Sequence, residues 1–214
     1  MADVVIDDFN RANSNTVGGG WTEYEEVATD LQIESNTLRM GRDSAAANAR
    51  AVTQGHGTLT YPVTLYYKIS ALNNAGRRLW TTIESSDALS LNGMGAGIRF
   101  LTNTANNVSI LHGGGETRTQ VNLDSNVDYY VWTDYTDNGS NIDIELYIST
   151  SATKPASPTL SAINVARADA GNFTNIYFDV SAAGQDLNID DFQLTDAAAG
   201  GAFTKPNYLG FSRL

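Results

Sequence analysis

The sequence predicts an all-β protein built from two packed antiparallel sheets, and three observations lead to this prediction. Residues 59–72 alternate apolar and polar side chains with the period of two that is typical of a half-buried strand. Asn138-Gly139 separates two runs rich in β-branched and aromatic residues, which is the strongest short-range signal for a hairpin. Only 17% of residues are charged, and Gly, Asn, Ser and Thr are abundant, which favours many short strands joined by tight turns.

The strands are expected in segments that can be read along the chain. The segments with strand patterns are 3–11, 31–34 and 37–40 as a hairpin, 59–72, 77–83, 96–101, 108–112, the central hairpin 129–148, 174–181 and 187–195. For residues 43–50 we expect a loop, because so short a helix is marginal without a packed face. Trp21 is expected to plug one end of the core. The glycines of residues 93–97 precede no helix, so they predict close approach of strands and no phosphate loop.

The central hairpin is predicted to have one apolar face and one face that is both aromatic and acidic. A two-residue Asn138-Gly139 loop would place Tyr135 opposite Ile142, with an apolar face on that side. The other face would then carry Tyr130, Trp132, Asp134, Asp143, Glu145 and Tyr147.

This second face is a candidate ligand-binding surface. In the predicted register Asp134 lies across from Asp143, and opposed like charges require a cation, an arginine, a hydrogen-bonding ligand or full solvation. Flat rings beside carboxylates suit a sugar, because the rings contact its C–H faces and the carboxylates accept hydrogen bonds from its hydroxyls. The alternative is an exposed sheet face that binds nothing.

Composition restricts the partners. The net charge of -11 and the pI near 4.4 argue against nucleic acid and anionic membrane, since both require a basic surface. Cysteine is absent, which excludes disulfides and thiolate chemistry. The first residues contain no basic region followed by an apolar stretch, so we expect no export by a classical signal unless one has been removed. No apolar run is long enough for a membrane span.

The C-terminal segment differs from the rest of the chain. Residues 197–202 have the composition of a flexible linker. The last dozen residues carry large apolar side chains that disordered tails usually lack: Phe203, Tyr208, Leu209, Phe211 and Leu214. The tail could pack back on its own domain or dock on a neighbouring subunit, and we expect docking because a linker precedes it.

Several short motifs resemble the concanavalin A-like lectin/glucanase superfamily, most closely its laminin G-like jelly-roll modules. The motifs are residues 7–11 followed by Trp21, the segments 31–33 and 36–38, the central hairpin, and residues 189–192. The likeness covers about residues 3–196. It implies a jelly-roll sandwich domain at residues 1–196, with its first and last strands adjacent, followed by an extended tail at 197–214.

The resemblance also implies a calcium site and raises the question of catalysis. In calcium-binding members, acids on the terminal strands supply ligands, and the matching residues here are Asp7, Asp8, Asp190 and Asp191, unless they face solvent. Laminarinase-like members carry two glutamates flanking an aspartate on one strand. Asp143-Ile144-Glu145 begins such a pattern, but no third acid follows, so we expect no glycoside hydrolase. His56 and His112 have no nucleophile motif beside them, so a catalytic triad is not expected.

We therefore expect a non-catalytic β-sandwich module that binds a glycan or a protein surface and is held in an assembly by its tail. A virion component, such as a phage capsid decoration or tail protein, fits the composition. One alternative is a secreted carbohydrate-active enzyme or its carbohydrate-binding module. Another is a structural cement protein whose hairpin face binds nothing.

Overall fold

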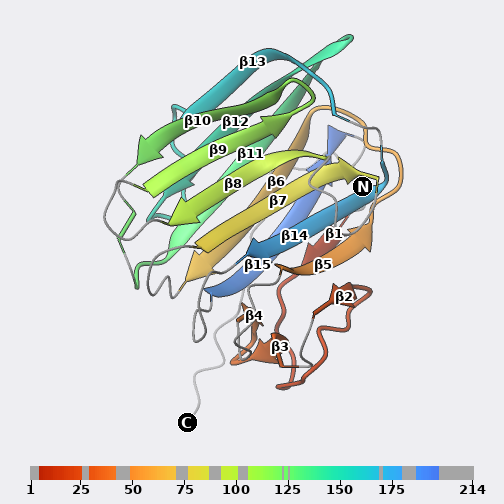
Figure 1. The fold of residues 1–214 in the computed structure, drawn as a ribbon, viewed down its shortest axis with the longest axis vertical. Coiled ribbons are helices and arrows are strands. Elements are labelled where there is room, and N and C mark those ends of the chain that lie inside the picture. Colours follow the sequence, from red (N-terminus) through yellow and green to blue (C-terminus); the bar gives the residue numbers. More distant parts are fainter. Residues whose placement is uncertain are drawn as a thin grey trace.

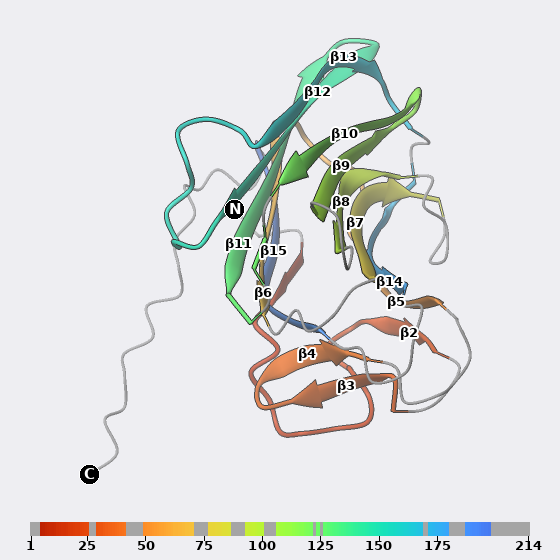
Figure 2. The ribbon, with the colours of Figure 1, turned by 60° about the vertical axis from the view of Figure 1, so that its left-hand side comes forward.

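The computed structural model describes residues 5–25, 29–41, 49–70, 77–86, 93–100, 106–121, 123–124, 126–168, 171–179 and 187–197. This part of the chain forms fifteen strands arranged in two antiparallel sheets that pack face to face (Figures 1 and 2). It contains no α-helix, and hence no helix with the length and hydropathy to cross a membrane. The predicted all-β class with two antiparallel sheets is confirmed.

The first sheet has eight strands in the order β13-β12-β11-β6-β15-β4-β3, with β1 paired to β15. Their bounds are β1 (Val5–Asp7), β3 (Leu31–Glu34), β4 (Thr37–Met40), β6 (Val63–Ser70), β11 (Tyr129–Asn138), β12 (Asn141–Ser149), β13 (Leu160–Ala166) and β15 (Leu187–Asp196). Val5 lies opposite Leu194, so the first and last strands are neighbours, as the resemblance implied.

The second sheet has seven strands in the order β10-β9-β8-β7-β14-β5-β2. Their bounds are β2 (Thr22–Tyr24), β5 (Ala49–Gly55), β7 (Arg77–Ser85), β8 (Met94–Phe100), β9 (Asn106–His112), β10 (Gly115–Val121) and β14 (Phe173–Asp179). The sequence patterns missed β2, β5 and β10 here, and β13 in the first sheet. β10 is partly or fully exposed along its whole length, so no apolar alternation reveals it. Of the expected loop at 43–50, residues 49 and 50 begin β5 instead, and 42–48 lie outside the described residues.

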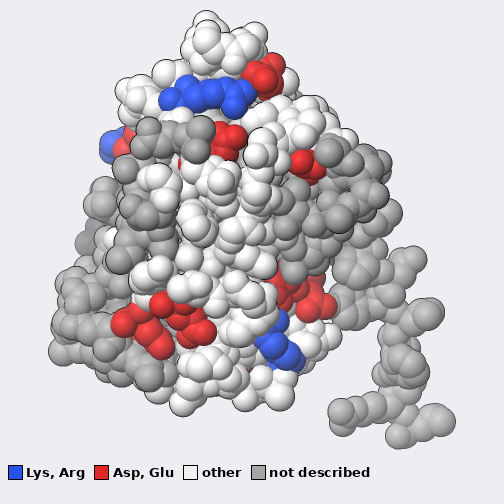
Figure 3. Space-filling view, turned by 90° about the vertical axis from the view of Figure 1, so that its right-hand side faces the viewer, with Lys and Arg blue, Asp and Glu red and all other residues white. Residues whose placement is uncertain are grey.

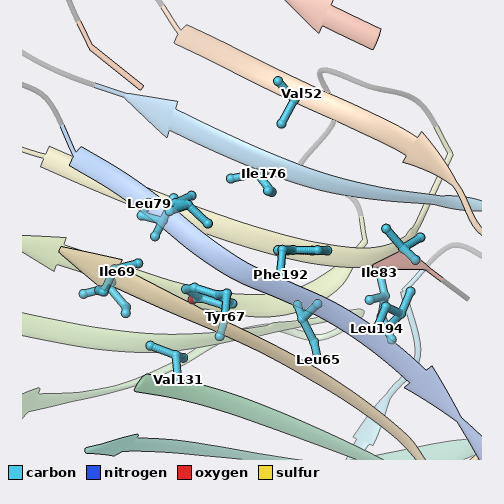
Figure 4. Packing of buried hydrophobic residues seen from close by; sticks show 14 of the residues in the cluster. Val52, Leu65, Tyr67, Ile69, Leu79, Ile83, Val131, Ile176, Phe192 and Leu194 are labelled. Atoms are coloured by element: carbon cyan, nitrogen blue, oxygen red, sulfur yellow. The ribbon is translucent and has the colours of Figure 1, made fainter. Parts of the chain in front are cut away.

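The core lies between the two sheets, where side chains from facing strands interdigitate (Figure 4). The 59–72 alternation places Val63, Leu65, Tyr67 and Ile69 on one face of the strand, and all four are buried. Phe192 of β15 packs beside Tyr67, with ring centroids 6.3 Å apart. Burial of each large apolar side chain contributes about 1.5–3 kcal/mol, so this layer holds the two sheets together.

The central hairpin forms, but its register differs by two residues from the prediction. Tyr135 lies opposite Ile144, and Asn138 pairs with Asn141, so the loop residues are Gly139 and Ser140. Gly139 has a φ of 78°, as the first residue of a type II′ turn requires, and its N–H donates to Asp137 Oδ1 at 2.8 Å. Because side chains alternate with period two, a shift of two residues leaves both faces as predicted.

Close approach of strands at the 93–97 glycines is confirmed at Gly95. A Cβ atom there would lie 2.0 Å from the carbonyl oxygen of Thr81 on the neighbouring strand β7. Only glycine therefore fits this position without a backbone shift.

Trp21 is buried, as expected, at one end of the core. Its ring meets the edge of Phe192 with centroids 5.4 Å apart, and its indole Nε1–H donates to Asp7 Oδ2 at 2.9 Å. The Trp21 contact thus joins the core to the end of the first strand.

Candidate functional site

An aromatic cluster separate from the core lies on the outer face of the first sheet. Its members are Tyr66, Trp132 and Tyr147, with Tyr130 packed against them, and we call these four residues the aromatic cluster. Trp132 of β11 lies opposite Tyr66 of β6 on one side and opposite Tyr147 of β12 on the other. The ring centroid of Trp132 is 5.4 Å from that of Tyr66 and 6.3 Å from that of Tyr130, which stacks at an interplanar angle of 25°.

Two carboxylates stand beside the aromatic cluster. Asp134 lies directly opposite Glu145 across the β11–β12 pair, one row along from Trp132 and Tyr147. Asp134 Oδ1 accepts a hydrogen bond from Thr64 Oγ1 at 2.9 Å, and Glu145 Oε2 accepts one from the Tyr147 hydroxyl at 2.8 Å. Aromatic rings and hydrogen-bond acceptors thus share one face.

The structure brings together five of the six predicted site residues. The sixth, Asp143, lies opposite Thr136 toward the hairpin loop and accepts a hydrogen bond from Asn164 N at 2.7 Å. The predicted opposition of Asp134 and Asp143 was wrong, because it followed from the register that placed Asn138 in the loop. Asp134 faces Glu145 instead, and the cation that such an opposition requires is Lys154.

Lys154 comes from the connection between β12 and β13, residues 150–158, which we call the strap. Its Nζ pairs with Asp134 Oδ2 and lies 4.0 Å from the centroid of the Tyr147 ring. In Figure 2 the strap is the teal connection that stands out from the first sheet on the side away from the second sheet. After the strap, Thr159 N–H donates to Leu146 O at 2.7 Å, which fixes the start of the return to β13.

The aromatic cluster is largely buried, and only its edge is accessible to solvent. Trp132 is 3% exposed and Tyr147 is 7% exposed, while Tyr130, Asp134 and Glu145 are half-buried. Burial raises the pKa of Tyr147, and its hydrogen bond to Glu145 raises it further, so the hydroxyl stays protonated and available as a donor. A ligand would meet Tyr130 and the two carboxylates first.

The same face extends to β15, where Asp190 lies opposite Lys68 of β6. Burial raises the pKa of Asp190 to about 6, and the neighbouring Asp191 contributes to the increase. Lys68 Nζ lies 2.8 Å from Asp128 Oδ2, so this lysine already has a carboxylate partner.

The calcium prediction at the terminal strands meets a different arrangement at Asp7. Its carboxylate accepts hydrogen bonds from Phe9 N, from both terminal nitrogens of Arg11 and from Trp21 Nε1, at 2.7–2.9 Å. These four donors occupy its acceptor positions, so Asp7 does not fit as a calcium ligand. Within the described ranges no three His, Cys, Asp or Glu side chains are grouped to hold a metal. Calcium binding at Asp8, Asp190 and Asp191 stays a prediction, and it would need oxygen ligands besides these carboxylates.

Sequence reasoning missed four residues that lie on or beside the outer faces of the two sheets. Tyr66 was placed on the polar face of its strand but was not joined to the hairpin, because the β6–β11 pairing cannot be deduced from local pattern. Lys154 lies in an irregular connection without a period. Trp80 and Tyr177 lie opposite each other on β7 and β14 of the second sheet. Alternation with the inward Leu79 would have placed Trp80 on the outer face of that sheet.

The predicted tail contacts cannot be compared with the structure. Phe203, Tyr208, Leu209, Phe211 and Leu214 lie outside the described residues.

Comparison with known proteins supports the fold. No family model matches the chain, and no curated protein matches its sequence. A glycosyl hydrolase family protein from Mycobacterium fortuitum aligns over 91% of this chain and 100% of its own, with a TM-score of 0.63 and 12% identity. An endo-1,3-β-glucanase from Streptomyces sioyaensis aligns over 91% of this chain and 95% of its own (TM-score 0.63, 10% identity). A legume lectin-like domain from Entamoeba histolytica aligns over 92% and 98% (TM-score 0.60, 12% identity).

These similarities define the class of fold: the chain is a two-sheet antiparallel jelly-roll sandwich, as predicted. At such low identity they show the fold alone. They give no support to the narrower likeness to laminin G-like modules or to phage proteins.

The expectation that the chain is not an enzyme is corrected by the same comparisons. Proteins that share this fold over most of their length include glycosyl hydrolases and glucanases. The incomplete motif at Asp143-Ile144-Glu145 was too narrow a criterion, because a search along one strand does not detect carboxylates that meet across two strands. Asp134 and Glu145 are such a pair.

Proposed function

We propose that this chain is a carbohydrate-active domain that binds a glycan on the outer face of its first sheet. The observation that carries the proposal is the aromatic cluster beside the opposed carboxylates Asp134 and Glu145, on the face of the first sheet that points away from the core. Rings offer flat apolar surface to the C–H faces of a sugar, and carboxylates accept hydrogen bonds from its hydroxyls. The hydrolases and the lectin-like domain that share the fold support this class of ligand.

The partly exposed residues define how a glycan would bind. Tyr130 stacks on Trp132 and presents the accessible ring of the aromatic cluster. Asp134 and Glu145 would accept hydrogen bonds from hydroxyls of the same sugar unit, and Lys154 would donate to it from the strap. The buried Trp132 packs beside Tyr130 on the same face and would hold its ring in place.

The test is calorimetric titration with a β-1,3-linked glucose oligosaccharide and a panel of other glycans. Tyr130→Ala should weaken binding about tenfold, which corresponds to about 1.4 kcal/mol. The matched control is Tyr177→Ala, since Tyr177 is also a half-buried tyrosine but belongs to the second sheet. If only Tyr177→Ala weakens binding, the glycan uses the other sheet. If no glycan binds the wild-type chain, the proposal fails.

A second candidate function is glycoside hydrolysis by Asp134 and Glu145. Asp134 and Glu145 lie directly opposite each other, which places their Cβ atoms about 4.5–5.5 Å apart. Their carboxyl groups therefore start from neighbouring positions, and a retaining glycosidase needs its two carboxyl groups about 5–5.5 Å apart. Release of reducing sugar from a β-1,3-glucan measures this activity. Glu145→Gln should abolish release while keeping glycan binding, because glutamine still accepts the Tyr147 hydrogen bond. Equal release by both proteins would exclude Glu145 as a catalytic residue.

The expected role in a larger assembly, such as a virion decoration or tail protein anchored by residues 197–214, stays a separate prediction. It rests on the composition of the tail. It is compatible with glycan binding, since the aromatic cluster and the tail are different parts of the chain.

A further inference from the structure

A polar pocket lies beside strand β3, apart from the aromatic cluster. Its volume is about 320 Å³, and its lining residues are Asn13, Ser14, Asn15, Gln32, Ile33 and Glu34. Such a volume is at the lower end of the range of small-molecule sites. Strand β3, which carries part of the lining, lies next to β4 at the lower end of the sandwich in Figure 2.

The pocket is rigidly built, because the loop of residues 13–16 is tied to β3. Ser14 and Ile33 exchange two backbone hydrogen bonds, each of 2.9 Å. Asn15 Oδ1 accepts from Gln32 Nε2 at 3.0 Å, and Asn13 Oδ1 accepts from Ser35 N at 3.1 Å. A preorganised site of this kind orders little further when a ligand binds.

The same bonds leave a defined set of polar atoms for a ligand. Asn13 and Asn15 use their oxygen atoms to hold the loop. Their Nδ2 groups make no hydrogen bond to the described residues. Glu34 is held through Oε2 by Arg39 Nε at 3.5 Å, which leaves Oε1 as an acceptor. The pocket thus presents two amide donors and one carboxylate acceptor.

This donor and acceptor set selects a neutral ligand rich in hydroxyl groups. Glu34 and the net charge of -11 disfavour an anion, and two amide donors disfavour a cation. Adjacent hydroxyls both accept and donate, so they can bind Asn13, Asn15 and Glu34 at once.

The pocket is a different place from the aromatic cluster. The pocket and the aromatic cluster lie on the same outer side of the first sheet, because Gln32 lies opposite Arg39 of β4 and Arg39 lies opposite Asn188 of β15. Along the sheet, however, they are far apart. Four strand spacings separate β3 from β11, which is roughly 19 Å at about 4.8 Å each. One sugar unit cannot contact both.

We propose that this pocket is a second sugar-binding site, which takes a single sugar unit through two neighbouring hydroxyls. The ligand class rests on the proposed function, while the location rests on the pocket itself. A glycan that reaches both places would bind through two contacts.

The experiment is an NMR titration of the ¹⁵N-labelled full chain with methyl glycosides of glucose, galactose, mannose and N-acetylglucosamine, and with a β-1,3-linked glucose oligosaccharide. The side-chain NH₂ signals of Asn13 and Asn15 report on the pocket, and the indole N–H of Trp132 reports on the aromatic cluster. We expect at least one sugar to shift the asparagine signals. If none does, the pocket proposal is overturned, whatever the Trp132 signal does.

Matched variants separate binding from folding. Asn15→Asp keeps the oxygen that accepts from Gln32 but removes the amide donor, and should weaken binding followed at Asn13 about tenfold. Asn172→Asp makes the same charge change at an exposed position near β14 and should leave affinity unchanged. Equal effects of the two variants would overturn the proposal. Shifts at Trp132 without shifts at Asn13 and Asn15 would keep the proposed function and remove the pocket. Shifts at Asn13 and Asn15 without shifts at Trp132 would keep the pocket and remove the proposed function.

Discussion

At the scale of single residues, Asp7 shows how one carboxylate fixes the end of the sandwich. Its two oxygen atoms form a bidentate ion pair with Arg11, and Oδ2 also accepts the indole hydrogen bond of Trp21. The side chain is 8% exposed. Asp7→Asn replaces one acceptor oxygen by an NH₂ group that faces these donors. We predict a loss of about 2–3 kcal/mol in the free energy of unfolding, measured by urea denaturation.

The control for this prediction is the neighbouring residue. Asp8→Asn makes the same change at a half-buried carboxylate that accepts from the backbone of Asn10 in an exposed turn. It should change the free energy of unfolding much less than Asp7→Asn. Equal effects would mean that the Asp7 network adds nothing beyond its charge.

Asp190 gives a prediction about pH. Burial raises its pKa from 3.8 to about 6, so the folded chain binds this proton more tightly than the unfolded chain. Its contribution to stability is therefore greatest below pH 3.8 and is lost as the pH rises to about 6. Because the group is partly solvated, Asp190→Asn should raise the free energy of unfolding at neutral pH by only about 1 kcal/mol. Denaturation at about pH 4 and about pH 7 checks this. Parallel pH profiles for the variant and the wild type would contradict it.

At the scale of elements, the central hairpin separates what local pattern determines from what it leaves open. The alternation of 129–148 assigned every side chain to the correct face, because a face depends only on odd or even position. The register depends on which two residues form the loop, and Asn138-Gly139 and Gly139-Ser140 are both acceptable pairs. The partner of Asp134 was beyond such reasoning, since Lys154 approaches it from the strap.

The strap yields a prediction of its own. Lys154→Met keeps the apolar stem but removes the ion pair to Asp134 and the cation–π contact with Tyr147. The two paired side chains are 31% and 25% exposed, so the loss of stability should stay below about 1 kcal/mol. We predict faster hydrogen exchange at the Trp132 indole N–H, measured by NMR. Lys68→Met, on the same face but paired with Asp128, should leave that rate unchanged. An unchanged rate in Lys154→Met would show that the ion pair does not hold the strap against the aromatic cluster.

At the scale of the whole molecule, the distribution of charged side chains and the pairing of distant strands are two separate features. Figure 3 shows the acidic side chains of the described residues in separate groups on one side, with basic side chains next to some of them. Long-range pairing determined the rest of the fold. The adjacency of β1 and β15 was anticipated from the resemblance to the lectin/glucanase superfamily. The place of β10 at the edge of the second sheet was not, because no apolar face marks it.

The end of the folded domain gives the last prediction. Asp196 Oδ2 accepts from Thr60 N at 3.0 Å, and Ala197 N–H donates to Thr60 O at 2.8 Å, so β15 is clamped where β6 approaches. A chain that ends at Ala197 keeps these bonds and should match the full chain in free energy of unfolding, measured by urea denaturation. A chain that ends at Gln193 loses Leu194, which is fully buried, and should be less stable by several kcal/mol. If the tail packs back on its own domain, the cut at Ala197 will itself lower stability. If the tail docks on a neighbour, that cut will leave stability intact and remove only association, measured by light scattering.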